Sequence, residues 1–254
     1  MYYHVYGHGN KILLAFHGFG RDGRDFKHLE PTFGKEYKII SFDLFYHGES
    51  DYPLNPETIN FYKEDLKNLI NQYLITNSID KFSLLAYSLG GRISLTLIEL
   101  FSDKIEKIFL FAPDGIKYSW GYSFVTKSNI GKKIYKGFIK SPGFIFLILK
   151  LGKAVRMIND SVYRFLIFQL ETEQKRQKVY DNWQFFRNIH PDIPHVQQLI
   201  NSKNINIQLY FGKYDTIIPP RYGKGFVKGL NNKDALHILD SGHNLIKESL
   251  NQVS

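Results

Sequence analysis

Short apolar runs alternate with longer segments of mixed polarity along most of this chain. Seven such runs predict β-strands at residues 2–6, 11–16, 37–42, 81–87, 106–112, 205–211 and 235–239. Between the runs, segments 22–29, 56–76 and 88–101 show helical patterns. Nearly continuous apolar strands separated by helices are typical of a parallel sheet that is covered on both faces. The turn-forming segment Tyr6-Gly7-His8-Gly9-Asn10 adds an expected antiparallel hairpin at the start.

The alternation stops between residues 114 and 203. This stretch contains helix-like patterns at 138–151, 162–170 and 174–189, and no clear strand. We therefore expect a core formed by residues 1–113 and 204–254, with residues 114–203 as a helical insertion. Most aromatic side chains of the insertion are expected to form a small core of its own.

The clearest chemical signal is the segment 82–91, Phe-Ser-Leu-Leu-Ala-Tyr-Ser-Leu-Gly-Gly. A strand-like run meets Ser88, and two glycines precede a helix-like run. A serine on so tight a turn projects its hydroxyl out of the fold, and the N–H of Leu89 lies at a helix N-terminus that favours negative charge. The usual pattern is Gly-x-Ser-x-Gly, and Ala86 stands here for the first glycine. The simpler interpretation is an ordinary Ser-Leu-Gly-Gly turn.

Three other strand ends supply the remaining parts of a serine-nucleophile site. Phe19 lies in a glycine-flanked loop after the second apolar run, where its N–H could join that of Leu89 in an oxyanion hole. Asp215 follows the sixth run and His243 follows the seventh. The chain order Ser88, Asp215, His243 is the order of this nucleophile-elbow class. We expect His243 to accept the serine proton and Asp215 to orient the imidazole.

These motifs resemble those of the α/β-hydrolase superfamily, and the resemblance covers nearly the whole chain. It implies an α/β-hydrolase fold, with a mostly parallel sheet and helices on both faces, and it makes residues 114–203 a lid. Such a lid excludes water and shapes the substrate pocket. The implied function is that of a serine hydrolase that cleaves a small-molecule carboxylic ester or thioester through an acyl-enzyme. Neither a metal nor an organic cofactor is required.

The acid has an alternative position. Asp114 also follows a strand end, where some members of this superfamily carry the acid. Asp215 is preferred because its Gly-x-x-Asp context after the penultimate strand is the commoner arrangement. Structural roles are expected for His17, which would brace the oxyanion loop, and for His47 and His237.

The substrate is less specified than the chemistry. The segment from Tyr87 to Arg92 is similar to the elbow of the menaquinone-pathway SHCHC synthase, a lyase in which both flanking residues contribute to the site. That resemblance implies substrate-binding roles for Tyr87 and Arg92, although an arginine here often only forms a surface ion pair. Length and motif spacing also resemble the pimeloyl-acyl-carrier-protein methyl ester esterase. A general small-ester hydrolase is preferred to both. A ligand-binding protein without turnover is disfavoured, because all three triad residues are present.

Composition excludes several classes of protein. The chain has 254 residues and no cysteine, so it has neither a disulfide framework nor a thiolate metal site. The longest apolar run, 144–149, is far shorter than the roughly 20 residues that span a bilayer. No signal-peptide pattern opens the sequence, and we expect a cytoplasmic protein by default.

The positive charge is concentrated in one region. Lys and Arg outnumber Asp and Glu by 33 to 24, which gives a net charge of +9. Between residues 115 and 159 there is no acidic residue, and the basic ones are Lys117, Lys127, Lys132, Lys133, Lys136, Lys140, Lys150, Lys153 and Arg156. With the apolar residues between them, they fit an anionic substrate, an acidic carrier protein or an anionic lipid surface. Nucleic acid is not expected, because no binding motif accompanies the charge. A solvated face that aids solubility is the simpler interpretation.

Overall fold

The computed structural model describes residues 1–50, 55–118, 120–158 and 160–248. The chain forms two compact units. The sheet unit contains Met1–Tyr52, Tyr62–Lys117 and Ile189–Ser254, and the helical unit contains Pro53–Phe61 and Tyr118–Asn188. These boundaries differ from the expected division at 114 and 203, mainly because α9 (Ile193–Ser202) packs against α3 (Leu89–Phe101) in the sheet unit.

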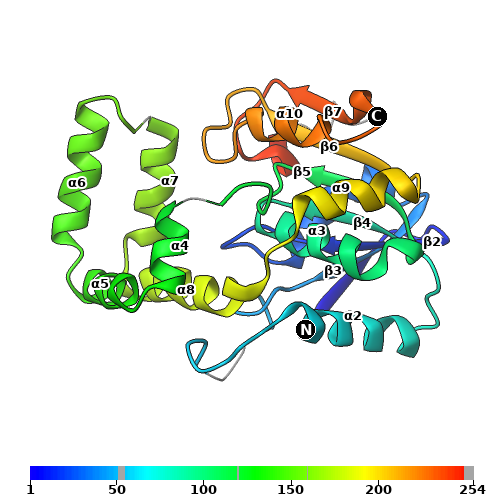
Figure 1. Ribbon diagram of the computed structural model, residues 1–254, viewed down its shortest axis with the longest axis horizontal. Helices are drawn as coiled ribbons and strands as arrows, with labels where there is room; N and C mark the ends of the chain where they lie inside the picture. Colours follow the sequence, from blue (N-terminus) through cyan, green and yellow to red (C-terminus); the bar gives the residue numbers. More distant parts are fainter. Residues whose placement is uncertain (51–54, 119, 159, 249–254) are drawn as a thin grey trace. The chain divides into compact units, whose positions relative to one another are not determined.

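The sheet unit is built on seven strands in the order β1-β3-β2-β4-β5-β6-β7 (Figure 1). The strands are β1 (Tyr3–Tyr6), β2 (Lys11–Phe16), β3 (Tyr37–Phe42), β4 (Phe82–Tyr87), β5 (Ile105–Phe111), β6 (Asn206–Gly212) and β7 (Leu236–Leu239). All pairs are parallel except the pair of β1 with β3. The predicted mostly parallel sheet is therefore confirmed.

The expected hairpin of the first two strands is wrong. β1 is antiparallel, but its partner is β3, with Val5 opposite Ile40. β2 has no free edge, because it pairs with β3 on one side and β4 on the other. The segment between β1 and β2 is therefore a crossover past the end of β3, in which His8 and Gly9 donate N–H groups to the carbonyl of Gly34.

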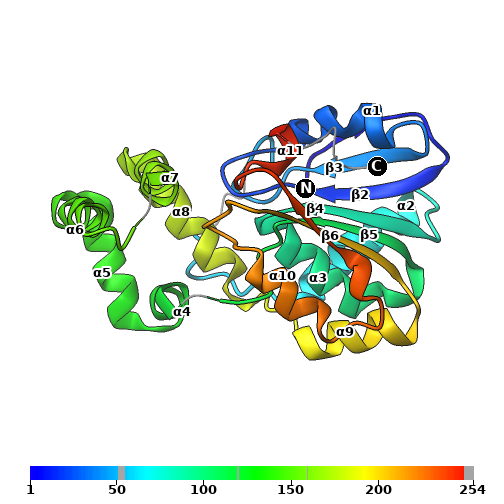
Figure 2. The same cartoon turned by 90° about the horizontal axis from the view of Figure 1, so that it is seen from above.

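Helices cover both faces of this sheet (Figure 2), which explains why its central strands are apolar at almost every position. α1 and α11 lie on one face, and α3, α9 and α10 lie on the other. The helices of the sheet unit are η1 (Gly23–Leu29), α1 (Glu30–Phe33), α2 (Lys63–Thr76), α3, η2 (Ser102–Lys104), α9, α10 (Arg221–Val227), η4 (Lys233–Ala235) and α11 (Leu245–Glu248), where η marks a 3₁₀-helix.

The helix expected over 56–76 begins only at Lys63. The backbone N–H of Tyr62 donates to Asp65 Oδ2 at 2.7 Å, which caps the first turn of α2. The preceding residues belong to the helical unit, where the Arg187 guanidinium donates to the carbonyls of Pro56 and Ile59, both at 2.8 Å. These carbonyls are held by a side chain instead of the backbone N–H groups of a helix.

The helical unit contains α4 (Trp120–Lys127), α5 (Asn129–Lys140), α6 (Gly143–Ala154), α7 (Asp160–Leu170), α8 (Glu173–Phe185) and η3 (Phe186–Asn188). The single helix expected over 138–151 is two helices, because the chain breaks at Ser141 and Pro142. The core of this unit includes Tyr180, Phe185 and Phe186, each at most 2% exposed. Among the described residues, no helix combines the length and the apolar character needed to cross a membrane.

Candidate active site

Ser88 occupies a sharp turn between β4 and α3. Its backbone has φ 50° and ψ −115°, a conformation that non-glycine residues rarely adopt. Three backbone hydrogen bonds hold it there: its N–H donates to Phe111 at 3.0 Å, and its carbonyl accepts from Gly91 and Asp114, both at 2.8 Å. The strained conformation is thus fixed by β5 and by the loop that follows β5.

The glycines after Ser88 are required by close packing. A Cβ on Gly90 would lie 1.9 Å from the carbonyl oxygen of Phe16, and one on Gly91 would lie 2.3 Å from Cβ of Pro113. Ala86 is fully buried in β4. The small residues predicted around the elbow therefore let α3 approach the ends of β2 and β5.

The structure brings Ser88, His243 and Asp215 together. His243 Nε2 lies 3.2 Å from Ser88 Oγ, and its Nδ1 lies 2.7 Å from Asp215 Oδ2. The other carboxylate oxygen of Asp215 accepts the N–H groups of Ile217 at 2.8 Å and Ile218 at 2.9 Å. The Asp215 side chain is 0% exposed. A buried carboxylate so held orients the imidazole that faces the serine.

Asp114, the alternative acid, is engaged elsewhere. Its Oδ2 lies 2.5 Å from a guanidinium nitrogen of Arg92, and its Oδ1 accepts the N–H of Gly115 at 2.8 Å. Arg92 is only 5% exposed, so this ion pair is largely shielded from solvent. Arg92, expected to bind substrate, is thus the ion-pair partner of Asp114.

Tyr87 supports the histidine loop. Its hydroxyl donates to the backbone carbonyl of His243 at 2.8 Å, and the two rings are 5.3 Å apart. Arg21 stacks over the Tyr87 ring, with its guanidinium carbon 5.4 Å from the ring centroid, and donates to the side chain of Asn244. None of these contacts was predictable from the sequence, because partners more than 60 residues apart leave no local pattern.

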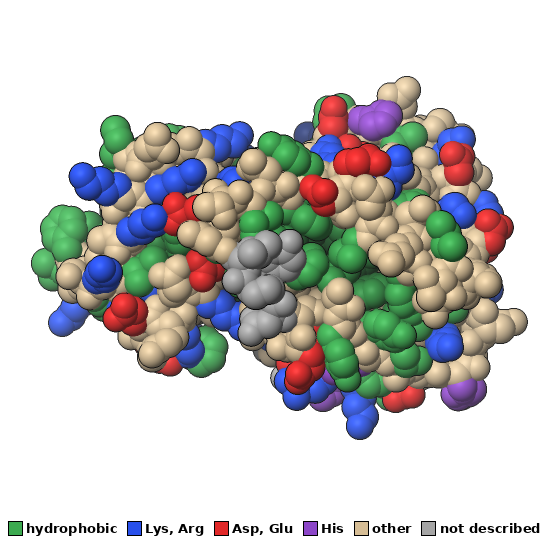
Figure 3. All heavy atoms as spheres, turned by 90° about the horizontal axis from the view of Figure 1, so that it is seen from below, with side chains coloured by type: hydrophobic (Ala, Val, Ile, Leu, Met, Phe, Trp, Pro, Cys, Tyr) green, Lys and Arg blue, Asp and Glu red, His purple; other side chains and the backbone are tan. Residues whose placement is uncertain are grey.

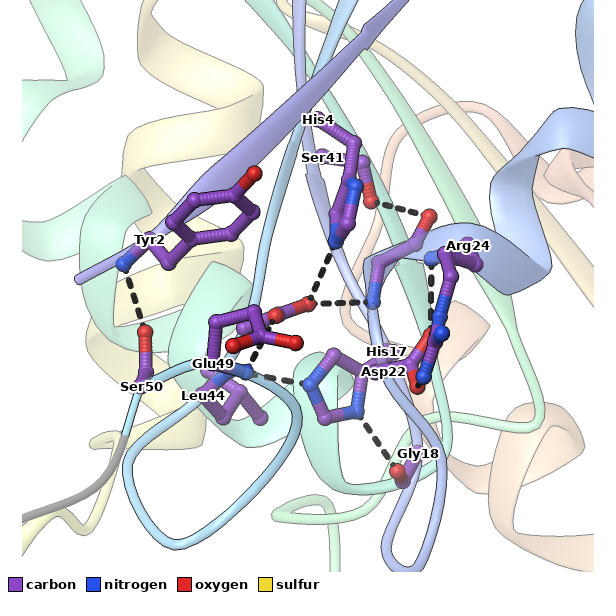
Figure 4. Close-up of polar contacts among 12 residues, drawn as sticks. Tyr2, His4, His17, Gly18, Asp22, Arg24, Ser41, Leu44, Glu49 and Ser50 are labelled. Atoms are coloured by element: carbon purple, nitrogen blue, oxygen red, sulfur yellow. Dashed lines mark hydrogen bonds and ion pairs between the residues drawn. The ribbon is translucent and has the colours of Figure 1, made fainter.

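The loop that contains Phe19 lies next to the elbow. A Cβ on Gly18 would come within 2.8 Å of the Tyr87 ring and 3.2 Å of Ser88 Cβ. His17 braces this loop: its Nε2 accepts the N–H of Leu44 at 2.9 Å, and its Nδ1 lies 2.7 Å from the Gly18 carbonyl (Figure 4). Leu44 can donate only to an unprotonated nitrogen, so His17 is neutral and protonated at Nδ1. Complete burial lowers the pKa of His17 to about 4.

A second buried carboxylate, Asp43, joins the loops on this side of the site. It accepts the N–H of Gly23 at 2.7 Å and the N–H of Glu49 at 2.8 Å, and His4 Nε2 lies 3.1 Å from it. His4 reaches this carboxylate from β1, and the backbone N–H of Glu49 reaches it from the loop after β3. In the sequence, the only hint of this role was the position of Asp43 directly after an apolar strand.

His47 and His237, for which structural roles were expected, have structural contacts. His47 is 1% exposed, and its ring lies 5.3 Å from that of Phe19. His237 hydrogen-bonds Gln208 and stacks on Tyr210, as expected for a half-buried strand residue. No group of three or more acidic or histidine side chains that could hold a metal occurs among the described residues.

Comparison with known proteins identifies the family. The sequence model of the alpha/beta hydrolase fold matches residues 11–139, just over half of the chain. The chain belongs to the alpha/beta hydrolase fold family. The predicted superfamily and fold are thereby confirmed.

Relatives of this α/β-hydrolase include proteins named as hydrolases and esterases. An uncharacterized hydrolase of Saccharomyces cerevisiae is 22% identical over 253 residues, which cover 92% of this chain and 83% of the yeast protein. The strigolactone esterase RMS3 of Pisum sativum is 30% identical over 132 residues, so the match spans only 46% of its length. A thermophilic esterase from Thermogutta terrifontis has a TM-score of 0.60 and 18% identity, covering 95% of this chain and 85% of that one. At this identity the structural match shows the fold alone.

Proposed function

We propose that this α/β-hydrolase cleaves a small-molecule carboxylic ester or thioester through an acyl-enzyme on Ser88. The observation that carries this proposal is the position of the His243 imidazole, 3.2 Å from Ser88 Oγ and 2.7 Å from Asp215 Oδ2. A neutral serine hydroxyl is a weak nucleophile and needs a base within hydrogen-bond reach. His243 meets that condition, and the carboxylate of the buried Asp215 binds the other nitrogen of its ring.

The reaction has two halves. Ser88 Oγ attacks the substrate carbonyl while His243 Nε2 takes its proton, and Asp215 stabilises the resulting imidazolium. His243 then gives this proton to the departing alcohol or thiol, which leaves an acyl group on Ser88. In the second half a water molecule loses a proton to His243 and attacks the acyl carbonyl. The bond from the acyl carbon to Ser88 Oγ then breaks, His243 returns the proton to Ser88 Oγ, and the carboxylic acid is released. The N–H groups of Leu89 and Phe19 bind the oxyanion in both halves, and each contributes about 2.7–4 kcal/mol.

A named relative supports ester chemistry, since a strigolactone esterase occurs among the sequence matches. The lyase alternative is weakened by the surroundings of the two elbow residues that it needs. The Tyr87 hydroxyl is bonded to the His243 carbonyl, and the Arg92 guanidinium is paired with Asp114. Both side chains have structural partners, so the ester hydrolase is the better explanation.

A screen of p-nitrophenyl esters of graded acyl length, with a fluorophosphonate probe for Ser88, tests the proposal. We expect rapid labelling of the wild type, turnover of at least the short esters, and neither in Ser88→Ala. Labelling without turnover of any ester would transfer support to the lyase. Failure of the probe to label the folded wild type would refute the serine mechanism.

A further inference from the structure

Helix α6 carries an exposed apolar stripe. Phe144, Leu147, Ile148 and Leu151 follow each other at the spacing that places residues on one side of a helix. Their exposed fractions are 72%, 52%, 46% and 55%. No residue of α6 is buried, although the helix is apolar over most of its length. Large apolar side chains that are exposed next to each other on a surface mark an interaction site.

Unpaired cations accompany the stripe. Lys140 precedes α6, Lys150 flanks the stripe on the helix, and Arg156 follows the last turn. All three are exposed, and none has an ion-pair partner among the described residues. Two neighbours are neutralised, since Lys136 pairs with Glu57 at 2.6 Å and Lys153 with Asp160 at 3.0 Å. Figure 3 shows basic and hydrophobic side chains together on the surface of this unit.

We propose that the α6 stripe docks the protein onto an anionic lipid surface. Apolar side chains on a helix, with Lys and Arg nearby, insert into the boundary between headgroups and acyl chains while the cations contact anionic lipid. With 12 residues, α6 is about 18 Å long, so it would lie in the plane of the interface instead of crossing the bilayer.

Charge favours this occupant over a second copy of the chain. Two copies joined through α6 would bring like-charged segments together, since residues 115–159 contain nine basic and no acidic residues. An acidic protein would satisfy the cations, but it would also need pockets to receive Phe144 and the three aliphatic side chains. A lipid surface accepts all four without preformed pockets.

Vesicle flotation of the full chain, without substrate, tests the proposal. The vesicles contain phosphatidylcholine alone or an equal mixture of phosphatidylcholine and phosphatidylglycerol. We expect binding to the anionic vesicles only, and weaker binding as salt is added. Lys140→Gln/Lys150→Gln should weaken it by about 25-fold, because each cation near the surface contributes about fivefold. Leu147→Gln/Leu151→Gln should weaken it by about tenfold or more.

Matched controls lie in the sheet unit. Lys35→Gln/Lys38→Gln removes two exposed lysines there, and Ile75→Gln removes an apolar side chain that is 70% exposed. These variants should bind the vesicles like the wild type. Far-ultraviolet circular dichroism checks that each variant is folded. Should the leucine variant not fold, the lysine variant still decides.

Three results would overturn the proposal. The first is absence of binding to the anionic vesicles, and the second is equal binding by the α6 variants and their controls. The third is a wild-type dimer in sedimentation velocity that Leu147→Gln/Leu151→Gln dissociates, which would make the stripe a self-association surface. If the first result is accompanied by capture of the protein on polyglutamate, the site belongs to an acidic protein partner. None of these measurements depends on Ser88, so the hydrolase proposal stands or fails separately.

Discussion

Helices α3 and α6 have similarly apolar sequences and opposite surroundings. Eleven of the thirteen residues of α3 are buried, whereas none of the twelve residues of α6 is. α3 packs on β2, β4 and β5 of the sheet, and α6 packs against α7. Apolar character alone therefore does not decide burial. The helix whose position is fixed by a sheet follows the strained Ser88, and the helix without a sheet leaves an apolar side exposed.

Ser88→Ala tests the catalytic role proposed for the turn before α3, and it has the largest expected effect. We expect turnover to fall roughly a million-fold, because the base and the acid act only through the serine. The fold should persist, since the hydroxyl projects from the turn and contributes little to packing. Ester hydrolysis and the midpoint of thermal unfolding measure the two effects. Retention of more than a small percentage of turnover would exclude the mechanism.

Asp215 and Asp114, the two acids near the elbow, contact different partners: Asp215 contacts His243, and Asp114 contacts Arg92. Asp215→Asn should lower turnover about ten-thousandfold, because the amide favours the wrong imidazole tautomer. Asp114→Asn should cost stability, since it weakens the ion pair of a buried Arg92. Its turnover per folded molecule should fall by less than about tenfold. Initial rates of both variants, corrected for the folded fraction, give the ranking. A larger loss in Asp114→Asn would make Asp114 the acid.

Adding one methyl group should have opposite effects on the free energy of unfolding at a glycine of the sheet unit and at a glycine of the helical unit. Gly90→Ala should destabilise the protein by roughly 3 kcal/mol or more, because the new Cβ would lie 1.9 Å from the Phe16 carbonyl oxygen. Gly137→Ala, within α5, meets no atom within 4 Å and should stabilise by about 0.5–1 kcal/mol. Urea unfolding of the two variants measures both values. Equal effects would show that the elbow is not closely packed.

At low pH, protonation of His17 should lower the free energy of unfolding of the sheet unit. The folded-state pKa of about 4 is below the ordinary value of 6.5, so the unfolded chain binds the proton more readily. Stability is therefore complete above the unfolded pKa and is lost as the pH falls toward the folded one. Between pH 7 and pH 5 we expect the free energy of unfolding to drop by about 2 kcal/mol. His17→Gln removes this titration, and its urea unfolding should show a correspondingly smaller change over the same interval.

The smallest effect is expected from the lysines of α5. If they steer an anionic substrate toward Ser88, Lys132/Lys133/Lys136→Glu should lower kcat/KM for an anionic ester by about tenfold. Added salt should lower the wild-type value for the same ester, and a neutral ester should respond little to either change. Steady-state kinetics with a matched pair of esters provides the comparison. Equal responses of both esters would end the steering hypothesis.

The sequence predicted the sheet well because its strands are buried on both faces. Each of the seven runs became a strand within one residue of its expected limits, and Ser88, Asp215 and His243 follow β4, β6 and β7 as expected. The partner of β1 was not predictable from a turn motif, because Gly7 and Gly9 serve a crossover as readily as a hairpin.

Less could be predicted where contacts are distant in sequence. The late start of α2 was not predictable, because Arg187, which lies more than 100 residues away, holds the carbonyls of Pro56 and Ile59. The bond from Tyr87 to the His243 carbonyl likewise joins two positions whose closeness only the folded sheet creates. In the helical unit, Pro142 was the one local sign that a single apolar segment would become two helices.

The Tyr87 hydrogen bond has a mechanical consequence. Tyr87 precedes Ser88 in the chain, and its hydroxyl holds the carbonyl of His243. This bond ties the end of β4 to the loop that contains His243, so a displacement of the strand end that moves Ser88 also pulls on the histidine loop. We expect the distance between Ser88 Oγ and His243 Nε2 to vary less with the Tyr87 hydroxyl present than without it.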